Sequence, residues 1–289
     1  MTTPAESPAD AEATAPEDPR PTKGRPIWLR LLLPVVIPVV VIAVWQYVGS
    51  RHLLAGGLFP SATACLDALW AWIFGGNQGD AVAGKWLSAL GASTTRVALG
   101  FVIGTFLGVL LGLISGISWI GRRMVDPSVN AIRPISVTAW VPLALIIFGI
   151  GYRPAIFLTA LATFFPVYVN TLSGARYAEG RLVQAARMLG ARPSQITFRV
   201  VLPAALPNIV VGMRVAAAIA WTTVVVAEML GAKSGLGYTL MYSYSQFKFD
   251  YVVAAMISIG AAGFATDKLL EYLAERRMSW VVGQSSDAA

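Results

Sequence analysis

Two ionisable residues, Arg214 and Glu228, lie within an otherwise uncharged stretch that runs from about Pro207 to Leu230. A charge inside a bilayer is unfavourable, so such residues often mark the pathway of a solute or an ion. Fourteen positions separate the two, which places them on one helix face but roughly 21 Å apart, too far to pair. Arg214 is expected to extend toward the inner interface and Glu228 to lie near the outer end. A purely structural role stays open for each.

The chain has little of the chemistry that a hydrolase or a metal enzyme needs. Cys65 is its only cysteine and His52 its only histidine, which argues against a disulfide framework and a zinc hydrolase. The sequence contains no HExxH, no GxSxG and no GxxxxGK[ST] pattern, so the usual protease, esterase and ATPase loops are missing. We therefore expect a chain without enzymatic activity, without a metal site and without a cofactor of its own.

The composition is that of a polytopic membrane protein. The chain has 289 residues, of which 56% are hydrophobic and only 13% charged, and its mean hydropathy is +0.65. A soluble protein carries about 25% charged residues, and a membrane span needs about 20 apolar residues. Six spans are expected, from the uncharged runs Leu31–Ser50, Val97–Gly121, Ile135–Tyr152, Pro154–Ala175, Val215–Ala227 (extended to Pro207 and Leu230) and Tyr251–Thr266.

The distribution of basic residues predicts the orientation. If the N-terminus lies inside, fifteen Lys and Arg residues fall on inner segments and five on outer ones, with Arg96 and Arg214 set aside because they lie near span ends. Cytoplasmic loops carry such an excess, so both termini are expected inside a multi-pass protein of the inner membrane. This topology also explains the net charge of +7 and the pI of about 9.8 without a nucleic-acid partner.

Three regions are expected along the chain. Residues 1–26 are rich in Pro, Ala and acidic residues, and we expect a disordered cytoplasmic tail because such a segment cannot bury enough apolar surface. The run that follows is not placed like a cleavable signal peptide. Residues 27–280 are expected to form the six-helix membrane domain, and residues 281–289 a short disordered tail.

Two features outside the loops concern packing. Leu66, Leu69, Trp70 and Ile73 have helical spacing and predict an amphipathic helix at the outer interface, anchored there by Trp70, Trp72 and Trp86. The second span carries glycines at a strict spacing of four, which lets another helix approach closely. Packing within the bundle is the favoured interpretation, with a homodimer seam or a moving surface as alternatives; the glycines are Gly100, Gly104, Gly108, Gly112 and Gly116.

Candidate pathway residues lie in the third and fourth spans. The third contains Trp140 and Pro142, and the fourth contains Phe165, Pro166 and Asn170. Prolines inside spans bend helices and free carbonyl groups. A bend that lines a solute pathway and a bend that packing requires both fit the pattern. Together with the two ionisable residues named above, these five are the candidates for a translocation pathway.

The long inner loop, residues 176–206, predicts a docking element. Its residues Glu179–Leu189 are expected to form a short helix, and Gly190 fits the left-handed position that follows a helix. One face of the helix is small and apolar and would suit close docking of another surface, while an interfacial helix on lipid headgroups is the alternative. That face consists of Leu182, Ala185, Ala186 and Leu189.

The same loop resembles the cytoplasmic signature loop of ABC importer permeases. The segment 184–203 reads Gln-Ala-Ala, three residues, Gly190, nine residues and Val-Val-Leu-Pro. The family pattern is Glu-Ala-Ala, three residues, Gly, nine residues and Ile-x-Leu-Pro, and every spacing fits. Gln184 replaces the family's Glu and Val200 its Ile. The first change removes a charge, which puts an ion pair to the ATPase in doubt but not docking itself.

Further stretches look like the nitrate, sulfonate and taurine type of these permeases. The resemblance extends from about Pro60 to Arg277 and leaves out the acidic tail. The stretches are Arg-Pro-Ile and Trp-Val-Pro-Leu within 133–143, Phe-Gly-Ile-Gly at 148–151, Phe-Phe-Pro-Val at 164–167, Asn-Thr at 170–171, Ala-Glu-Met at 227–229 and Ser-Gly-Leu-Gly at 234–237.

The resemblance implies an all-α type I importer permease with a MetI-like fold. Two copies would form the pathway across the lipid, an ATPase dimer would bind ATP and Mg²⁺, and an extracytoplasmic binding protein would deliver the solute. Contacts to the binding protein are expected at Ser234, Gly235, Leu236 and Gly237. The expected ATPase-coupling residues are Glu179, Arg181, Leu182, Gln184, Ala185, Ala186, Leu189, Gly190, Leu202 and Pro203.

The resemblance favours a small anionic solute, an alkanesulfonate or taurine first and nitrate second. A vitamin precursor or another small organic solute is the alternative within the family. An ion-coupled carrier or channel without an ATPase is the alternative outside it, and would predict acidic or histidine residues at the middle of the membrane or inverted repeats. A membrane scaffold or sensor would not need the spaced loop motif.

Overall fold

The computed structural model describes residues 27–51, 58–75, 81–178 and 181–277, and these residues form helices, turns and loops without a strand. The expected tails 1–26 and 281–289, and the coupling candidate Glu179, lie outside them. The elements are α1 (Ile27–Ser50), α2 (Ala62–Phe74), α3 (Trp86–Ile117), η2 (Gly121–Val125), α4 (Asp126–Ile132), η3 (Val137–Trp140), α5 (Val141–Phe148), α6 (Arg153–Ala178), α7 (Arg181–Met188), α8 (Pro193–Ile196), η4 (Thr197–Val201), α9 (Leu202–Gly231), α10 (Leu236–Ser245) and α11 (Phe249–Arg277).

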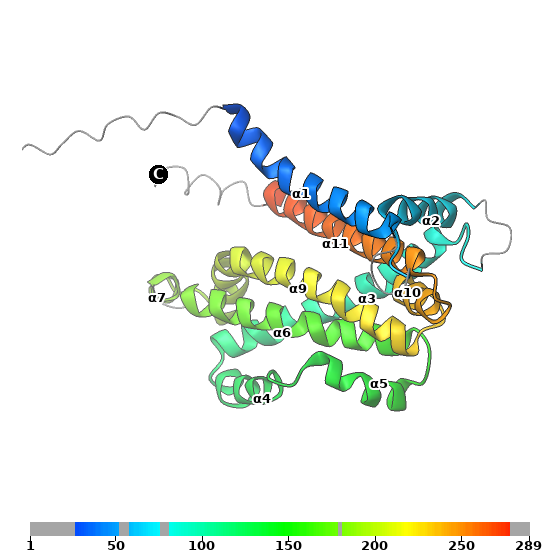
Figure 1. Ribbon diagram of the computed structural model, residues 1–289. Helices are drawn as coiled ribbons and strands as arrows, with labels where there is room; N and C mark the ends of the chain where they lie inside the picture. Colours follow the sequence, from blue (N-terminus) through cyan, green and yellow to red (C-terminus); the bar gives the residue numbers. More distant parts are fainter. Residues whose placement is uncertain (1–26, 52–57, 76–80, 179–180, 278–289) are drawn as a thin grey trace, which may run out of the picture.

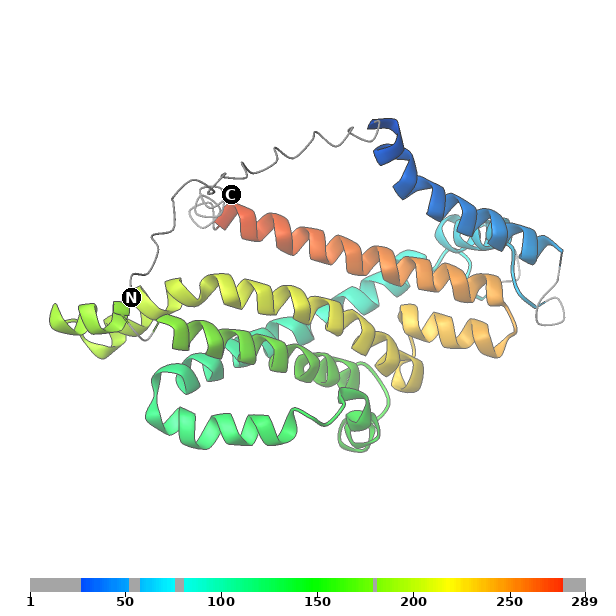
Figure 2. The same ribbon diagram turned by 60° about the vertical axis from the view of Figure 1, so that its left-hand side comes forward.

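The long helices α3, α6, α9 and α11 run along one axis, with α7 at one end of the molecule and α2 and α10 at the other (Figures 1 and 2). We call these the α7 end and the α10 end. Helix α6 lies between α3 and α9 and packs along both. The packed helices therefore separate two sets of loops, one at each end of the bundle (Figure 1).

Within the described residues, four helices are long and apolar enough to cross a membrane, namely Trp86–Ile117, Arg153–Tyr177, Pro193–Gly231 and Phe249–Ala274. A fifth span is present if the bent pair Gly121–Ile132 and Val137–Phe148, which meet at 86°, is taken as one. Helix α1 is 24 residues long, and its stretch Val36–Ser50 is apolar. The all-helical, multi-span prediction is confirmed, whereas the count of six stays a prediction.

The expected third span is not one continuous helix. Its residues form η3 and then the eight-residue α5. Pro142 lies in the first turn of α5, where its missing N–H is tolerated, and Gly149 ends the helix with φ +72°. The preceding α4 is held to α6 because Asp126 accepts hydrogen bonds from Tyr168 Oη at 3.2 Å and Arg176 Nη2 at 2.8 Å. The segment is therefore divided by the proline at the start of α5 and by these contacts of α4, although its apolar composition is that of a continuous span.

The glycine stripe of α3 packs against α6, as the favoured interpretation predicted. A Cβ built on Gly100 would lie 2.6 Å from Thr159 Cβ, and one on Gly112 would lie 2.7 Å from Thr171 Cβ. Real Cβ atoms essentially never approach so closely, so the stripe excludes larger residues. The facing residues of α6 repeat with the same spacing and are Thr159, Thr163, Val167, Thr171 and Ala175.

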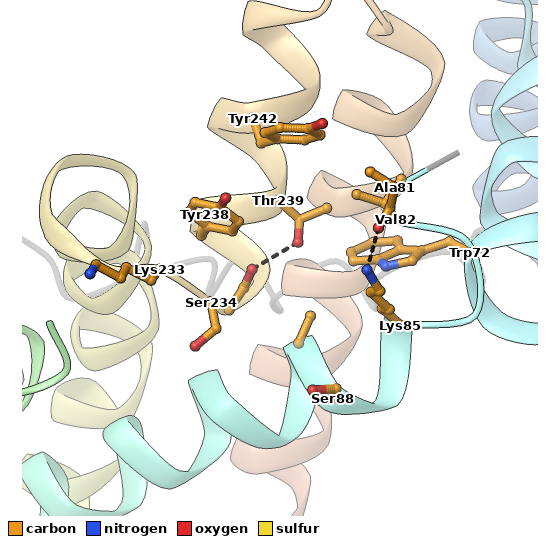
Figure 3. A pocket seen from close by; sticks show the side chains of 12 residues that line it. Trp72, Ala81, Val82, Lys85, Ser88, Lys233, Ser234, Tyr238, Thr239 and Tyr242 are labelled. Atoms are coloured by element: carbon orange, nitrogen blue, oxygen red, sulfur yellow. Dashed lines mark hydrogen bonds between the residues drawn. The ribbon is translucent and has the colours of Figure 1, made fainter. Parts of the chain in front are cut away.

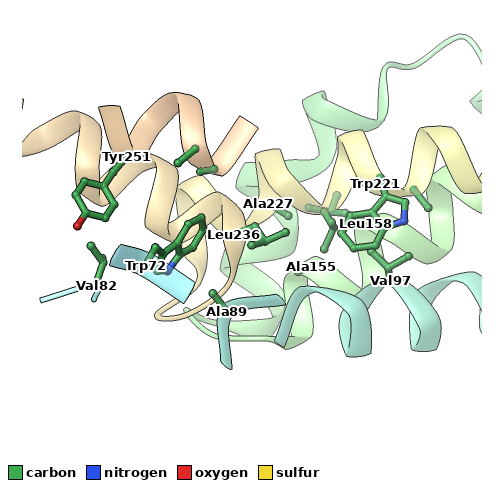
Figure 4. Packing of buried hydrophobic residues seen from close by; sticks show 14 of the residues in the cluster. Trp72, Val82, Ala89, Val97, Ala155, Leu158, Trp221, Ala227, Leu236 and Tyr251 are labelled. Atoms are coloured by element: carbon green, nitrogen blue, oxygen red, sulfur yellow. The ribbon is translucent and has the colours of Figure 1, made fainter. Parts of the chain in front are cut away.

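The largest hydrophobic cluster lies toward the α10 end (Figure 4). Trp72 is completely buried in it, so the expectation that Trp72 is an interfacial anchor is wrong: its helical face turns toward α3 and α11. Trp70 is 65% exposed, as an interfacial anchor requires. Trp86 is half-buried and donates a hydrogen bond from Nε1 to Ser258 Oγ at 2.9 Å.

Candidate functional sites at the two ends of the bundle

At the α7 end, the predicted loop helix is present as α7, Arg181–Met188. Gly190 has φ +76°, the left-handed conformation expected after this helix, which glycine adopts without strain. Its N–H donates to Arg187 O at 3.0 Å, and the N–H of Ala191 donates to Ala186 O at 3.0 Å. A Cβ at Gly190 would meet nothing within 4 Å, so the need for glycine there is conformational, not steric.

Helix α7 is attached to the bundle mainly through Val183, a residue that the sequence reasoning missed. Val183 is only 4% exposed and packs with Ala175, Ile196 and Val201. Ala186, three positions later, is half-buried against the same cluster. The signal was present in the sequence, because residues three apart share a helix face.

The rest of the predicted apolar face stays uncovered. Leu182 is 56% exposed and Leu189 is 87% exposed, and Ala185 between them is also exposed. Met188 adds to this surface at 91% exposure. Apolar side chains gathered on a short exposed helix indicate a surface that another molecule covers. We call Leu182, Ala185, Met188 and Leu189 the α7 apolar face.

The remaining coupling candidates divide between the surface and the bundle. Gln184 is exposed on α7. Leu202 and Pro203 are half-buried and begin α9, where proline fits the first turn of a helix. The side chain of Arg181 lies outside the described residues. The loop therefore has two parts. Helix α7 is exposed on the surface of the chain, and the start of α9 joins the loop to a span.

At the α10 end, Glu228 is completely buried and paired with Arg96, which is 7% exposed. Ser93 Oγ lies 2.8 Å from Glu228 Oε2, and the backbone N–H of Gly237 donates to the same oxygen at 3.0 Å. A buried charge needs a partner and further hydrogen bonds. Sequence reasoning missed Arg96, which was set aside as a residue near a span end and is 132 positions away from Glu228.

The same arginine holds the loop between α9 and α10. Arg96 Nη1 donates to Ser234 O at 2.7 Å, and Nη2 donates to Ser234 Oγ at 2.8 Å. Gly235 has φ +118°, and a Cβ there would collide with the carboxylate of Glu228. We call Ser93, Arg96, Glu228, Ser234 and Gly237 the buried charge network.

This network changes the interpretation of the four expected binding-protein contacts. Gly235, Leu236 and Gly237 are buried, and only Ser234 is exposed. The N–H of Leu236 donates to Ser93 Oγ at 2.8 Å. The segment Ser234–Gly237 is thus a clamp that closes over Glu228, and direct contact with a partner is open only to Ser234 in this conformation.

The other ionisable candidate, Arg214, is paired with acids on α11. Its Nε and Nη2 donate to the two oxygens of Asp267, both at 3.2 Å, and Nη2 lies 3.8 Å from Glu271 Oε1. Arg214 and Glu228 belong to separate ion pairs, as their spacing predicted. Because its charge is compensated on α11, Arg214 does not act as an isolated cation that favours anions.

The remaining pathway candidates do not form one cluster. Asn170 Nδ2 donates to Pro166 O at 2.8 Å, and a Cβ on Gly212 would lie 2.8 Å from Asn170 Cβ. These residues therefore make the contact between α6 and α9. Phe165 is buried against Phe164, Tyr168 and their neighbours, while Trp140 and Pro142 begin the separate helix α5. Their role in a pathway stays a prediction.

A helical bundle with several apolar spans, an uncovered apolar helix at one end and a clamped loop at the other defines a multi-pass membrane subunit that works with partners. The chain belongs to the family of binding-protein-dependent transport system inner membrane components, whose family model matches residues 104–279. It is thus a non-catalytic inner-membrane permease of the ABC importer type, a class that works with an ATPase and a binding protein.

Three relatives are similar to almost the whole chain. The putative aliphatic sulfonates transport permease protein SsuC of Bacillus subtilis is 33% identical, over 90% of this chain and 91% of that protein. SsuC of Escherichia coli is 36% identical over 88% and 93%. The taurine transport system permease protein TauC of Escherichia coli is 31% identical over 88% and 92%.

A solved structure supports the fold. It is a chain of the MetNI methionine ABC transporter, solved in inward-facing conformations, with a TM-score of 0.50 and 22% sequence identity. The match covers 64% of this chain and 94% of that chain. At this identity the likeness concerns the fold alone, and it agrees with the MetI-like fold predicted from the loop motif.

Proposed function

We propose that this permease imports a small organic anion, an alkanesulfonate or taurine, delivered by an extracytoplasmic binding protein. The observation that supports the solute class most is the similarity, over nine-tenths of the chain, to permeases named for aliphatic sulfonates and over 88% of it to one named for taurine. Nitrate has no such support from these three relatives. Membership of the family favours an ATP-driven importer over an ion-coupled carrier or channel.

We further propose that the α7 end faces the cytoplasm and the α10 end faces outward, with the N- and C-termini inside. The excess of Lys and Arg on the segments at the α7 end supports this orientation. The α7 apolar face would then dock on the ATPase, which binds ATP and Mg²⁺, and two copies of the chain would enclose the pathway. ATP binding would favour one of two conformations of the bundle by changing the contacts at α7.

Uptake by a strain that lacks this gene tests the proposal. Labelled taurine, ethanesulfonate and nitrate would be offered to the deletion strain and to the strain complemented with the wild-type chain. We expect loss of taurine or ethanesulfonate uptake in the deletion strain, full rescue by the wild type, and no rescue by Gly190→Pro, because proline cannot adopt the φ of +76° at this position.

Gln184→Glu is the matched control in the same loop, and it should restore uptake because it keeps the helix and returns the family's residue. Unchanged sulfonate and taurine uptake in the deletion strain would overturn the proposed solute class. Uptake that survives inactivation of the partner's ATP site would overturn the importer mechanism.

A further inference from the structure

A pocket of about 330 Å³ opens at the α10 end between the start of α3 and the loop that leads into α10 (Figure 3). Small-molecule pockets in proteins begin at roughly this size, about 300 Å³. Two lysines and several hydroxyl groups line the pocket, and among the residues that the structure describes none of those lining it is acidic. Its polar lining residues include Trp72, Lys85, Ser88, Lys233, Ser234 and Tyr238.

One wall of the pocket carries a buried indole N–H without an acceptor and, beside it, an exposed lysine. Trp72 is completely buried, and its Nε1 has no hydrogen-bond partner in the part of the chain that the structure describes. Lys85 lies beside it in Figure 3 and uses one of its donors for Ala81 O at 2.7 Å. An ammonium group has three donors, so two remain. Buried donors normally have a partner, and an acceptor ligand would supply one here.

The opposite wall is held in place by the buried charge network. Ser234 accepts from Arg96 through both Oγ and its carbonyl oxygen, so neither bond uses the hydroxyl hydrogen, which can donate to a ligand. Glu228 compensates the charge of Arg96 below this wall. Lys233 lies at the far edge, and its ammonium points away from Tyr238 and Ser234 in Figure 3. Of the two lysines, Lys85 is therefore the one whose ammonium group lies beside Trp72 in the pocket (Figure 3).

We propose that this pocket binds a small organic anion, with the sulfonate or carboxylate group accepting hydrogen bonds from Trp72 Nε1 and Lys85 Nζ. Ser88 and Ser234 would complete the donor set. The inference rests on the proposed function for its biological meaning, since it places a solute-selective site on the permease at the end that would receive the solute. The chemistry of the pocket itself stands on the lysine, the orphaned indole N–H and a described lining that contains no acidic residue.

The site can be tested by measuring whether a cysteine placed in the pocket reacts faster with an anionic reagent than with a cationic one. Ser88 is exposed and lines the pocket, so Ser88→Cys would be made in a Cys65→Ala background, and the complex with its ATPase purified in detergent. Its thiol would be modified with an anionic and a cationic methanethiosulfonate reagent. Ser245→Cys is the matched control, because Ser245 is exposed at the same end and lines a pocket that contains no charged residue.

We expect the ratio of anionic to cationic modification rates to be at least about fivefold higher at Ser88→Cys than at Ser245→Cys, because one nearby charge in a hydrated site changes each of the two rates by up to about fivefold, in opposite directions. Lys85→Gln should remove this difference, whereas Lys233→Gln should leave most of it. Ethanesulfonate should slow modification of Ser88→Cys but not of Ser245→Cys, and Trp72→Phe should weaken this protection. Equal ratios at the two positions, or protection that Lys85→Gln leaves unchanged, would overturn the inference.

The labelling experiment does not require transport, so its outcome and that of the uptake experiment can be told apart. An anion preference that depends on Lys85, combined with unchanged sulfonate uptake in the deletion strain, would keep the pocket and overturn the proposed function. Loss of sulfonate uptake in the deletion strain, combined with no anion preference at Ser88→Cys, would keep the proposed function and overturn the pocket.

Discussion

The two ends of the bundle differ in the kind of side chain that each buries and exposes. At the α10 end, charged and polar side chains point inward. Glu228 is completely buried, and its hydrogen-bond donors, such as the N–H of Gly237, belong to the same chain. At the α7 end, apolar groups are turned outward, so that Leu189 is 87% exposed on a helix attached by the buried Val183. The buried charge network at the α10 end is satisfied within the chain, while the α7 end has the surface of a component that a partner completes.

The largest effect should come from breaking the buried ion pair. Arg96→Met leaves Glu228 buried without its cation, and we expect a loss of about 3–5 kcal/mol in the free energy of unfolding. Thermal unfolding of the purified protein would measure it. The double variant Arg96→Met/Glu228→Leu should recover much of the loss, since it replaces both charges with apolar groups. A double variant as unstable as Arg96→Met would contradict the account of this end.

The close packing of α3 on α6 between the two ends depends on the glycine stripe. Gly112→Ala would place a Cβ 2.7 Å from Thr171 Cβ, and we expect it to destabilise the protein by about 1–3 kcal/mol through overpacking. Gly91→Ala is the matched control on the same helix, since a Cβ there meets nothing within 4 Å. It should stabilise α3 by about 0.5–1 kcal/mol. Equal melting temperatures for the two variants would argue against close packing of α3 on α6.

A bulky residue on the α7 apolar face should affect binding and not stability. Ala185→Trp should leave the free energy of unfolding within about 0.5 kcal/mol of the wild type, because the site is exposed. It should abolish co-purification of the ATPase, because small residues allow close docking. Ser194→Trp, exposed on α8, is the control for added bulk and should keep the ATPase bound. If both variants retain the ATPase, the face is not its docking surface.

The smallest effect is expected where the loop departs from the family pattern. Gln184 is exposed, and Gln184→Glu adds a charge without changing the packing of α7. Its melting temperature should therefore match that of the wild type, since surface changes stay within about 0.5 kcal/mol. A large loss of taurine or ethanesulfonate uptake in this variant would show that the neutral side chain is required.

Local sequence patterns predicted the α7 end well. Gly190 after a short helix, and the spacing of the apolar residues, are signals within ten residues of each other, and the helix and the left-handed glycine are both present. The glycine stripe was predictable for the same reason, because a spacing of four fixes one helix face.

The α10 end and the third span could not be predicted in this way. Arg96 and Glu228 are 132 positions apart, and only the packing of α3 beside α9 brings them together. The apolar run Ile135–Tyr152 has the composition of a span, but a 3₁₀ turn and the proline at the start of α5 divide it. Composition measures how apolar a segment is and not where its backbone must turn.

Protection of α7 by the ATPase is the most direct test of the central claim, that the α7 apolar face is covered by a partner. Met188 is 91% exposed, so Met188→Cys in a Cys65→Ala background would be labelled with a maleimide reagent, with Ser245→Cys at the α10 end as the reference.

We expect labelling of Met188→Cys to slow at least about tenfold when the ATPase is bound, since a tenfold change corresponds to only about 1.4 kcal/mol of protection. Labelling of Ser245→Cys should be unchanged by the ATPase. Equal labelling of Met188→Cys with and without the ATPase would contradict the claim that this helix couples the permease to it.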